Sequence, residues 1–325
     1  MNKKVLFWAF TAMALTACSN NETPESANEA TAKIRLSASI DATLTRAADG
    51  IQSTKIVTSS STDDYRPSVY VYKNTETSTT SGYGYENIDV TAVDASGNFT
   101  TTDMFYPQSR GPVDVYVYAP RVATGASLTA MPITVLSDQS GQTNYLRSDF
   151  IYGQALNQAY PSGTPAAINV TLKHALSKIK LVITGGTGSP SISGSSVKEV
   201  KLGHDTDATK QPLTQATVNI TNATLSSAVT TATSGAKSVI KFANSSTAQS
   251  TVTAIIPPQT LTSCPLSVMI DDAVYTAELS SPAGGFVAGN QYTYSVKVDL
   301  KGLTISSTEI TPWTNVDVSG SINVE

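Results

Sequence analysis

Strict alternation of apolar and polar residues near both ends of the chain is the strongest constraint on its fold. Between residues 34 and 44 every second side chain is apolar, and the residues between them are polar or charged. The last residues of the chain repeat this pattern. A period of two places alternate side chains on opposite faces of an extended strand, so each segment predicts a strand with one buried face. The buried faces would carry Ile34, Leu36, Ala38 and Ile40 in the first strand, and Val316, Val318, Ile322 and Val324 in the last.

The rest of the chain predicts many short strands and no long helix. Alternation or β-branched runs occur at residues 69–72, 112–119, 168–172, 178–184, 251–256 and 292–300. Clusters of Gly, Ser and Asn, such as Ser96-Gly97-Asn98, separate these runs and indicate turns. We therefore expect an all-β fold of two β-sandwich domains in tandem. A stretch of Pro and small residues at 159–167 predicts the boundary, which divides the folded chain into residues 33–166 and 167–325.

The N-terminus resembles the signal of a bacterial lipoprotein. A positive start at Lys3 and Lys4 precedes an apolar run that is too short for a permanent membrane span. The following Leu15-Thr16-Ala17-Cys18 resembles a lipobox. We expect a signal peptide at residues 1–17, cleavage before Cys18, and acyl chains on Cys18 that bind outer-membrane lipid. The alternative is an ordinary secretory signal with a chance cysteine. Residues 18–32 are polar and aperiodic, which predicts a flexible tether.

Charge and composition exclude some functional classes. The formal net charge of −4 becomes −6 when Lys3 and Lys4 leave with the signal peptide, which gives no electrostatic reason to bind nucleic acid. Hydrophobic residues make up 40% of the chain, too many for a disordered protein. With Cys18 acylated, Cys264 is alone and cannot form an intramolecular disulfide. Its apolar neighbourhood predicts a small buried side chain rather than a nucleophile.

No residue pattern indicates catalysis, a cofactor or a metal site, and we expect a protein that is not an enzyme. The chain has two histidines. His174 lies between two predicted strands, which favours a packed or interdomain side chain. His204 lies in His-Asp-Thr-Asp, which is more typical of a solvated turn than of a metal site. The pairs Asp63-Asp64 and Asp271-Asp272 also predict turns, because no calcium-loop spacing surrounds them.

Arg46 lies just beyond the first predicted strand. It is followed by Ala47, Ala48, Asp49 and Gly50, small or turn-forming residues that suit a cleavable loop. A trypsin-like cut between Arg46 and Ala47 would detach the first strand and open an apolar groove. The C-terminal strand of a neighbouring copy could fill this groove by β-strand addition. Alternatively, both segments are ordinary edge strands and Arg46 is an ordinary loop residue; the pattern alone leaves both hypotheses open.

Several segments, taken in order along the chain, resemble the fimbrillin family, the FimA-like and Mfa-like type V pilins of Bacteroides-type bacteria. They are the lipobox, Leu44-Thr45-Arg46-Ala47, Asp149-Phe150-Ile151-Tyr152-Gly153, the stretch from Val170 to Ile179, Gly289-Asn290-Gln291-Tyr292-Thr293-Tyr294, and Ile310-Thr311-Pro312-Trp313. The resemblance implies two sandwich domains with transthyretin-like, Greek-key topology. It also implies a lipoprotein precursor, removal of the first strand by an arginine-specific protease at Arg46, and polymerisation with residues 315–325 as donor strand.

Because this chain carries candidates for both the cut site and the donor strand, it resembles a stalk subunit more than an anchor or tip subunit. Its partners would be other copies of itself and related pilin subunits, in a cell-surface fimbria used for adhesion or biofilm. The competing hypothesis is a surface lipoprotein that binds a glycan without polymerising. Tyr83 and Tyr85, or Tyr70 and Tyr72, could supply its aromatic platform, although alternating tyrosines are more typical of a sheet surface.

Overall fold

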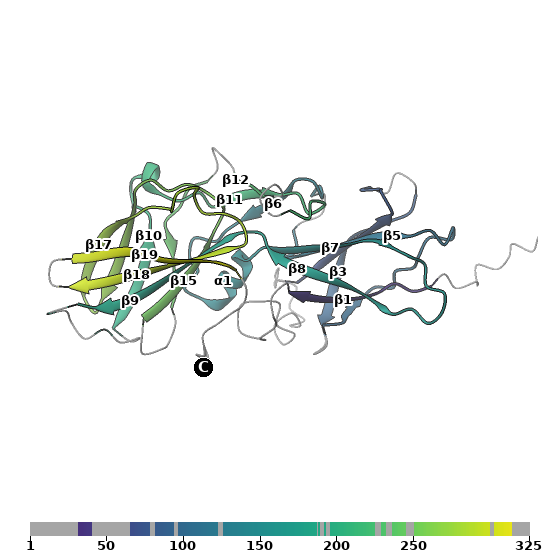
Figure 1. The fold of residues 1–325 in the computed structure, drawn as a ribbon, viewed down its shortest axis with the longest axis horizontal. Helices are drawn as coiled ribbons and strands as arrows, with labels where there is room; N and C mark the ends of the chain where they lie inside the picture. The colour runs from purple at the N-terminus through teal and green to yellow at the C-terminus, as the bar shows by residue number, and fades with distance from the viewer. Residues whose placement is uncertain are drawn as a thin grey trace, which may run out of the picture.

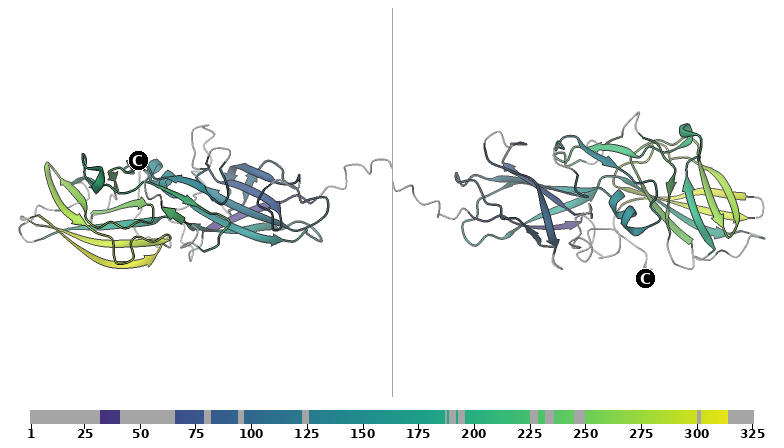
Figure 2. Two further views of the ribbon diagram at one scale, coloured as in Figure 1. Left: turned by 90° about the horizontal axis from the view of Figure 1, so that it is seen from above. Right: turned by 180° about the vertical axis from the view of Figure 1, so that it is seen from behind.

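In a computed structural model the protein is an elongated molecule built almost entirely of β-strands (Figure 1). The structure describes residues 32–40, 66–78, 82–93, 97–122, 126–186, 188, 192, 196–224, 229–231, 236–244, 250–299 and 302–313. Within these residues the helices are α1 (Gln142–Ser148) and the one-turn 3₁₀ helix η2 (Ala208–Lys210). The all-β fold class is confirmed. Figure 2 shows two lobes along the long axis, and the first strands of the chain lie at one end.

The first lobe is built on one seven-stranded sheet. In spatial order its strands are β1 (Arg35–Ile40), β8 (Ala167–His174), β7 (Ile151–Gln158), β5 (Val113–Ala119), β2 (Ser68–Lys73), β3 (Tyr85–Val93) and β4 (Phe99–Thr101). β1 runs parallel to β8, whereas the other neighbours pair antiparallel. Single bridges join Ser37 to Asn98 and Lys33 to Phe105. The sheet therefore curls until its first strand meets the segment around its last.

Both faces of the central strands β2 and β5 are buried. Their valines, such as Val71 and Val115, point into a core enclosed by the seven-stranded sheet. Their tyrosines, such as Tyr70 and Tyr72, point into a second core that includes Met131. The prediction that alternating tyrosines mark a sheet surface is wrong here, because a second layer of the protein covers them. Tyr70 and Tyr72 are 4% and 2% exposed and cannot form a glycan platform.

Three further sheets make up the rest of the described chain. The five-stranded sheet is β14 (Ala243–Asn244), β15 (Ser250–Ile256), β9 (Ser177–Gly185), β18 (Asn290–Asp299) and β19 (Gly302–Pro312). The four-stranded sheet is β13 (Ile240–Lys241), β10 (Val197–Leu202), β16 (Cys264–Ile270) and β17 (Ala273–Leu279). The three-stranded sheet is β12 (Val229–Thr231), β11 (Gln215–Val218) and β6 (Met131–Thr134). Buried side chains of all three sheets join one hydrophobic cluster.

The sheets do not divide the chain at residue 166. β8 begins at Ala167 yet belongs to the sheet of the first lobe, and β6 pairs with β11 across that position. The stretch 159–167 connects β7 to β8 within one sheet. The chain passes into the five-stranded sheet only at Ala175 and Leu176, between β8 and β9. The tandem arrangement of two sandwiches, with Greek-key connections, stays a prediction.

Candidate functional site

β1 lies in a slot with protein backbone on both sides. On one side it forms a parallel ladder with β8, from Arg35 opposite Ala167 to Ile40 opposite Leu172. On the other side, N–H groups donate to the segments before and after β4. Ile34, the residue just before β1, donates to the Met104 oxygen at 2.8 Å, and Ala38 in β1 donates to the Gly97 oxygen at 3.0 Å. Removing β1 would therefore expose two rows of unpaired backbone groups, which are strong hydrogen-bonding partners for another strand.

The side chains of β1 complete the core of the first lobe. Ile34 and Leu36 are each 3% exposed and pack in the cluster with the valines of β2 and β5, while Ala38 is half-buried beside it. Lys33 and Arg35 on the other parity are exposed. The predicted alternation is confirmed over these residues. Ile40 belongs to the ladder with β8. Each of the two buried aliphatic side chains contributes about 1.5–3 kcal/mol to holding the strand in place.

Gly97 allows the outer wall of the slot to approach β1 closely. Its φ is +83°, a conformation that favours glycine. A Cβ atom at this position would lie 2.5 Å from the backbone oxygen of Ala38. Sequence reasoning assigned Gly97 only to a turn. The pairing of its segment with β1 was missed, because nothing local in the sequence marks so distant a contact.

Two tyrosines hold the same wall in place. The Tyr83 hydroxyl donates to the Phe105 oxygen at 2.8 Å, and the Phe105 N–H donates to the Tyr85 hydroxyl at 2.9 Å. The two rings meet edge to face with centroids 5.8 Å apart. Burial raises the pKa of the Tyr83 hydroxyl, and the neighbouring Tyr85 adds to the shift. Both tyrosines are half-buried with their hydroxyls engaged, so they are part of the slot rather than an exposed glycan platform.

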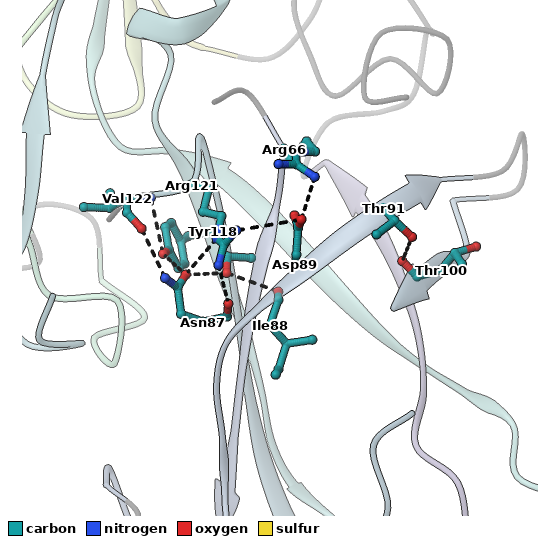
Figure 3. A network of polar contacts seen from close by, with 10 residues as sticks. Arg66, Asn87, Ile88, Asp89, Thr91, Thr100, Tyr118, Arg121 and Val122 are labelled. Carbon is teal, nitrogen blue, oxygen red and sulfur yellow. Dashed lines mark hydrogen bonds and ion pairs between the residues drawn. The ribbon is translucent and has the colours of Figure 1, made fainter. Parts of the chain in front are cut away.

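A polar network holds Arg66, just before β2, against β3 and the end of β5 (Figure 3). Arg66 donates to Asp89 at 2.5 Å. The amide oxygen of Asn87 accepts from the Tyr118 hydroxyl at 2.8 Å, and its amide nitrogen donates to the Val122 oxygen at 3.2 Å. Arg121 also donates to the backbone oxygen of Asn87 at 3.1 Å. These hydrogen bonds fasten Arg66, β3 and the end of β5 to one another, and none of them involves β1.

The sequence model of the fimbrillin-like family matches residues 45–313, which is most of the chain. The chain belongs to the fimbrillin-like family. A fimbrial or adhesive role, rather than an enzymatic one, follows at the level of the family. No curated protein matches this fimbrillin-like chain significantly.

Solved structures share the fold of this fimbrillin-like protein. A proposed cell adhesion protein from Bacteroides ovatus matches with a TM-score of 0.65 and 19% identity, covering 89% of this chain and 100% of that one. One from Bacteroides uniformis matches with a TM-score of 0.60 and 19% identity, covering 87% and 99%. At this level of identity the likeness concerns the fold alone.

A cleft of about 700 Å³ opens where β1 of the fimbrillin-like protein begins. It is lined by Lys33, Arg35 and Arg110 together with Tyr160. The guanidinium carbon of Arg110 lies 5.5 Å from the Tyr160 ring centroid. The Tyr160 hydroxyl accepts a 3.3 Å hydrogen bond from the Ala32 N–H, so this residue also holds the start of β1. Basic groups beside an aromatic ring suit an acidic ligand.

The other candidate residues of the fimbrillin-like chain have structural roles. Cys264 is buried at the start of β16, and burial raises the pKa of its thiol to about 12, as expected of an inert packed side chain. His204 lies in an exposed turn, where its Nδ1 accepts from the Asp207 N–H at 3.1 Å. Asp271 lies in the turn between β16 and β17. His174 is a packed residue, hydrogen-bonded to Asp149.

Among the residues that the structure describes, no three His, Cys, Asp or Glu side chains gather as a metal site would require. None of the described helices is long and apolar enough to cross a membrane. Nine residues singled out by the sequence lie outside the described residues: Cys18, Arg46, Ala47, Asp63, Asp64, Val316, Val318, Ile322 and Val324. Their roles stay predictions.

Proposed function

We propose that this protein is a stalk subunit of a cell-surface fimbria, made as an outer-membrane lipoprotein and polymerised by strand exchange. Acyl chains on Cys18 deliver the precursor to the outer membrane. An arginine-specific protease then cuts between Arg46 and Ala47 and releases β1. The segment 315–325 of another copy, or of a related subunit, takes the place of β1 and links the two subunits.

The position of β1 is the observation that carries this proposal. β1 is the first strand of the described chain, yet it is paired on both sides and fills the core with Ile34 and Leu36. One cut in the connection to β2 therefore separates it from every other strand. The body that remains is fastened at Arg66 and Asp89 and keeps both walls of the slot.

The C-terminal segment has the composition that the slot needs. Val316, Val318, Ile322 and Val324 present one apolar face, and burying four such side chains stabilises the junction by on the order of 6–12 kcal/mol before entropy costs. Gly320 stands in the middle of this face, as the small Ala38 does in β1. Donor and acceptor are different surfaces, so the contact does not close on itself and produces a filament. A subunit that both gives and receives a strand suits the stalk.

Limited digestion with an arginine-specific protease tests this function. We expect cleavage after Arg46 and then a ladder of oligomers on gels run without boiling. Arg46→Gln should block the cut, and deletion of residues 315–325 should abolish the ladder while the monomer stays folded. Arg35→Gln, on the outward face of β1, is the matched control and should behave as the unmodified protein. The proposal is excluded if protein that is cut after Arg46 and still has residues 315–325 stays monomeric at high concentration.

The cleft at the start of β1 favours a second candidate function, a surface lipoprotein that binds an acidic glycan without polymerising. Two of the cations that line the cleft would be removed together with β1, because Lys33 lies two residues before β1 and Arg35 is its first residue. The cleft would therefore be lost when β1 leaves. Binding of a carboxylated saccharide to the uncut protein, unchanged by deletion of residues 315–325 and weakened by Arg110→Gln, would support this function instead.

A further inference from the structure

A buried cluster of aromatic and charged side chains lies where the two lobes meet. His174 ends β8 in the seven-stranded sheet, and Trp313 directly follows β19 in the five-stranded sheet. Their rings stack with centroids 4.0 Å apart and planes at 10°. The imidazole Nδ1 lies 2.9 Å from a carboxylate oxygen of Asp149. The ammonium of Lys178, at the start of β9, lies 5.7 Å from the Trp313 ring centroid.

This cluster is costly to bury. His174, Asp149, Lys178 and Trp313 are all at most 4% exposed. His174 Nε2, one oxygen of Asp149 and the indole Nε1 of Trp313 are buried without a hydrogen-bond partner among the described residues. Unpaired buried polar atoms oppose folding, and an apolar cluster of the same shape would avoid that cost. Stability therefore does not account for the cluster, whereas its position between the lobes suits a positioning role.

The backbone around the stack ties the end of β19 to the passage between the lobes. The Trp313 N–H donates to the Gly289 oxygen at 2.6 Å, and the Gly289 N–H donates to the Leu176 oxygen at 2.8 Å. The Ala175 N–H donates to the Phe150 oxygen at 2.8 Å, next to Asp149. Trp313 is thus held both by its ring and by its backbone, and its contacts reach strands of both sheets.

We propose that Trp313, stacked on His174, is the fixed root of the C-terminal segment. Everything up to Trp313 stays part of the folded body, and the arm that follows it is the proposed donor segment, residues 315–325. His174 and Asp149 act as positioning residues, because they orient Trp313 and do not contact the partner subunit themselves.

The root also decides where tension on the arm is carried. Among the strands that the structure describes, β19 pairs with β18 alone, and its last pair joins Pro312 to Asn290. A pull on the arm would peel such a strand one pair at a time from this end. Because Trp313 stacks on His174, the seven-stranded sheet bears this force before the Pro312–Asn290 pair opens. This transmission rests on the proposed fimbrial function, whereas the anchoring of Trp313 does not.

The test uses the full chain with Trp8→Phe, which leaves Trp313 as the one tryptophan. We expect the fluorescence of Trp313 to resist quenching by acrylamide equally in the monomer and in the oligomers that the cut protein forms. His174→Ala should lower amide exchange protection at Trp313 and the end of β19 by about threefold to tenfold, the equivalent of one aromatic pair. Amides of β16 should keep their protection, since a general loss of stability would lower it too.

His204→Ala is the matched control, because that histidine lies in an exposed turn, and it should change none of these values. Unchanged exchange at Trp313 in His174→Ala would overturn the proposal. Acrylamide quenching of Trp313 in the oligomers would also overturn the proposal. This measurement uses His174 unchanged, so it can be made even if His174→Ala does not fold. If clipped protein forms no ladder, the fimbrial function fails, and exchange in the monomer still decides whether Trp313 is anchored.

Discussion

The first and last described strands of this protein are both terminal strands of their sheets, yet they are held in opposite ways. β1 is short, sits between two backbone walls, and buries Ile34 and Leu36. β19 is longer, pairs only with β18 among the described strands, and leaves Ile310 51% exposed. β1 therefore lies inserted between two segments of backbone, as the proposed strand exchange requires, whereas β19 lies at the edge of its sheet, with Trp313 packed at its end. Burial on both sides, rather than strand length, makes a position suitable for exchange.

The largest effect should come from truncating the buried face of β1. Leu36→Ala is expected to lower the free energy of unfolding by about 2–5 kcal/mol, because it leaves a cavity in the core of the first lobe. Ile310→Ala on β19 should cost about 0.5 kcal/mol or less, since that side chain is largely exposed. Urea unfolding of the two variants measures the difference. Equal losses would show that β1 is no more deeply inserted than β19.

A smaller effect should come from the wall opposite β8. Gly97→Ala forces a positive φ on alanine and drives its Cβ into the Ala38 oxygen, for an expected cost of about 2–4 kcal/mol. Gly284 has a similar φ of +90°, but a Cβ added there would have no described atom within 4 Å. Gly284→Ala should therefore cost only the conformational penalty of about 1–2 kcal/mol. The difference between their unfolding free energies isolates the close approach of the wall to β1. No difference would mean that the wall yields freely.

The smallest effect near neutral pH, and a growing one above pH 10, should come from tyrosine ionisation in both regions. Tyr83 holds the wall beside β1, and Tyr294 donates to the Ser280 oxygen from β18, next to β19. Burial raises the pKa of Tyr294 to about 12 from its ordinary value of 10.0, and it raises that of Tyr83 as well. The unfolded chain ionises first, so the contribution of both hydroxyls is complete below pH 10, and that of Tyr294 is lost as pH rises through about 12.

Thermal unfolding between pH 8 and pH 12 measures this loss. Tyr294→Phe should make the melting temperature depend less on pH. Tyr275→Phe, at a half-buried position on β17, serves as the control. A melting temperature that does not fall above pH 10 would contradict the prediction.

Several elements were predictable from local pattern. Alternation at 178–184 and 251–256 predicted β9 and β15, and the predicted face of β1 is buried at Ile34 and Leu36. Local pattern failed where burial comes from a second layer, as at Tyr70 and Tyr72, because a side chain cannot signal what covers it. Residues 159–167 connect β7 to β8 in one sheet, and Pro and Gly mark a turn equally well inside a sheet and between domains, so the domain boundary stays a prediction.

The sequence by itself determined the strand character of the chain, the face that β1 buries and the family to which the chain belongs. These depend on side-chain order and period, which are local properties. Only the tertiary structure decided that β1 has a wall on each side, that Gly97 forms part of one, and that His174 stacks on Trp313. Those contacts join residues that are far apart in sequence, and the compact packing of sheets brings them together.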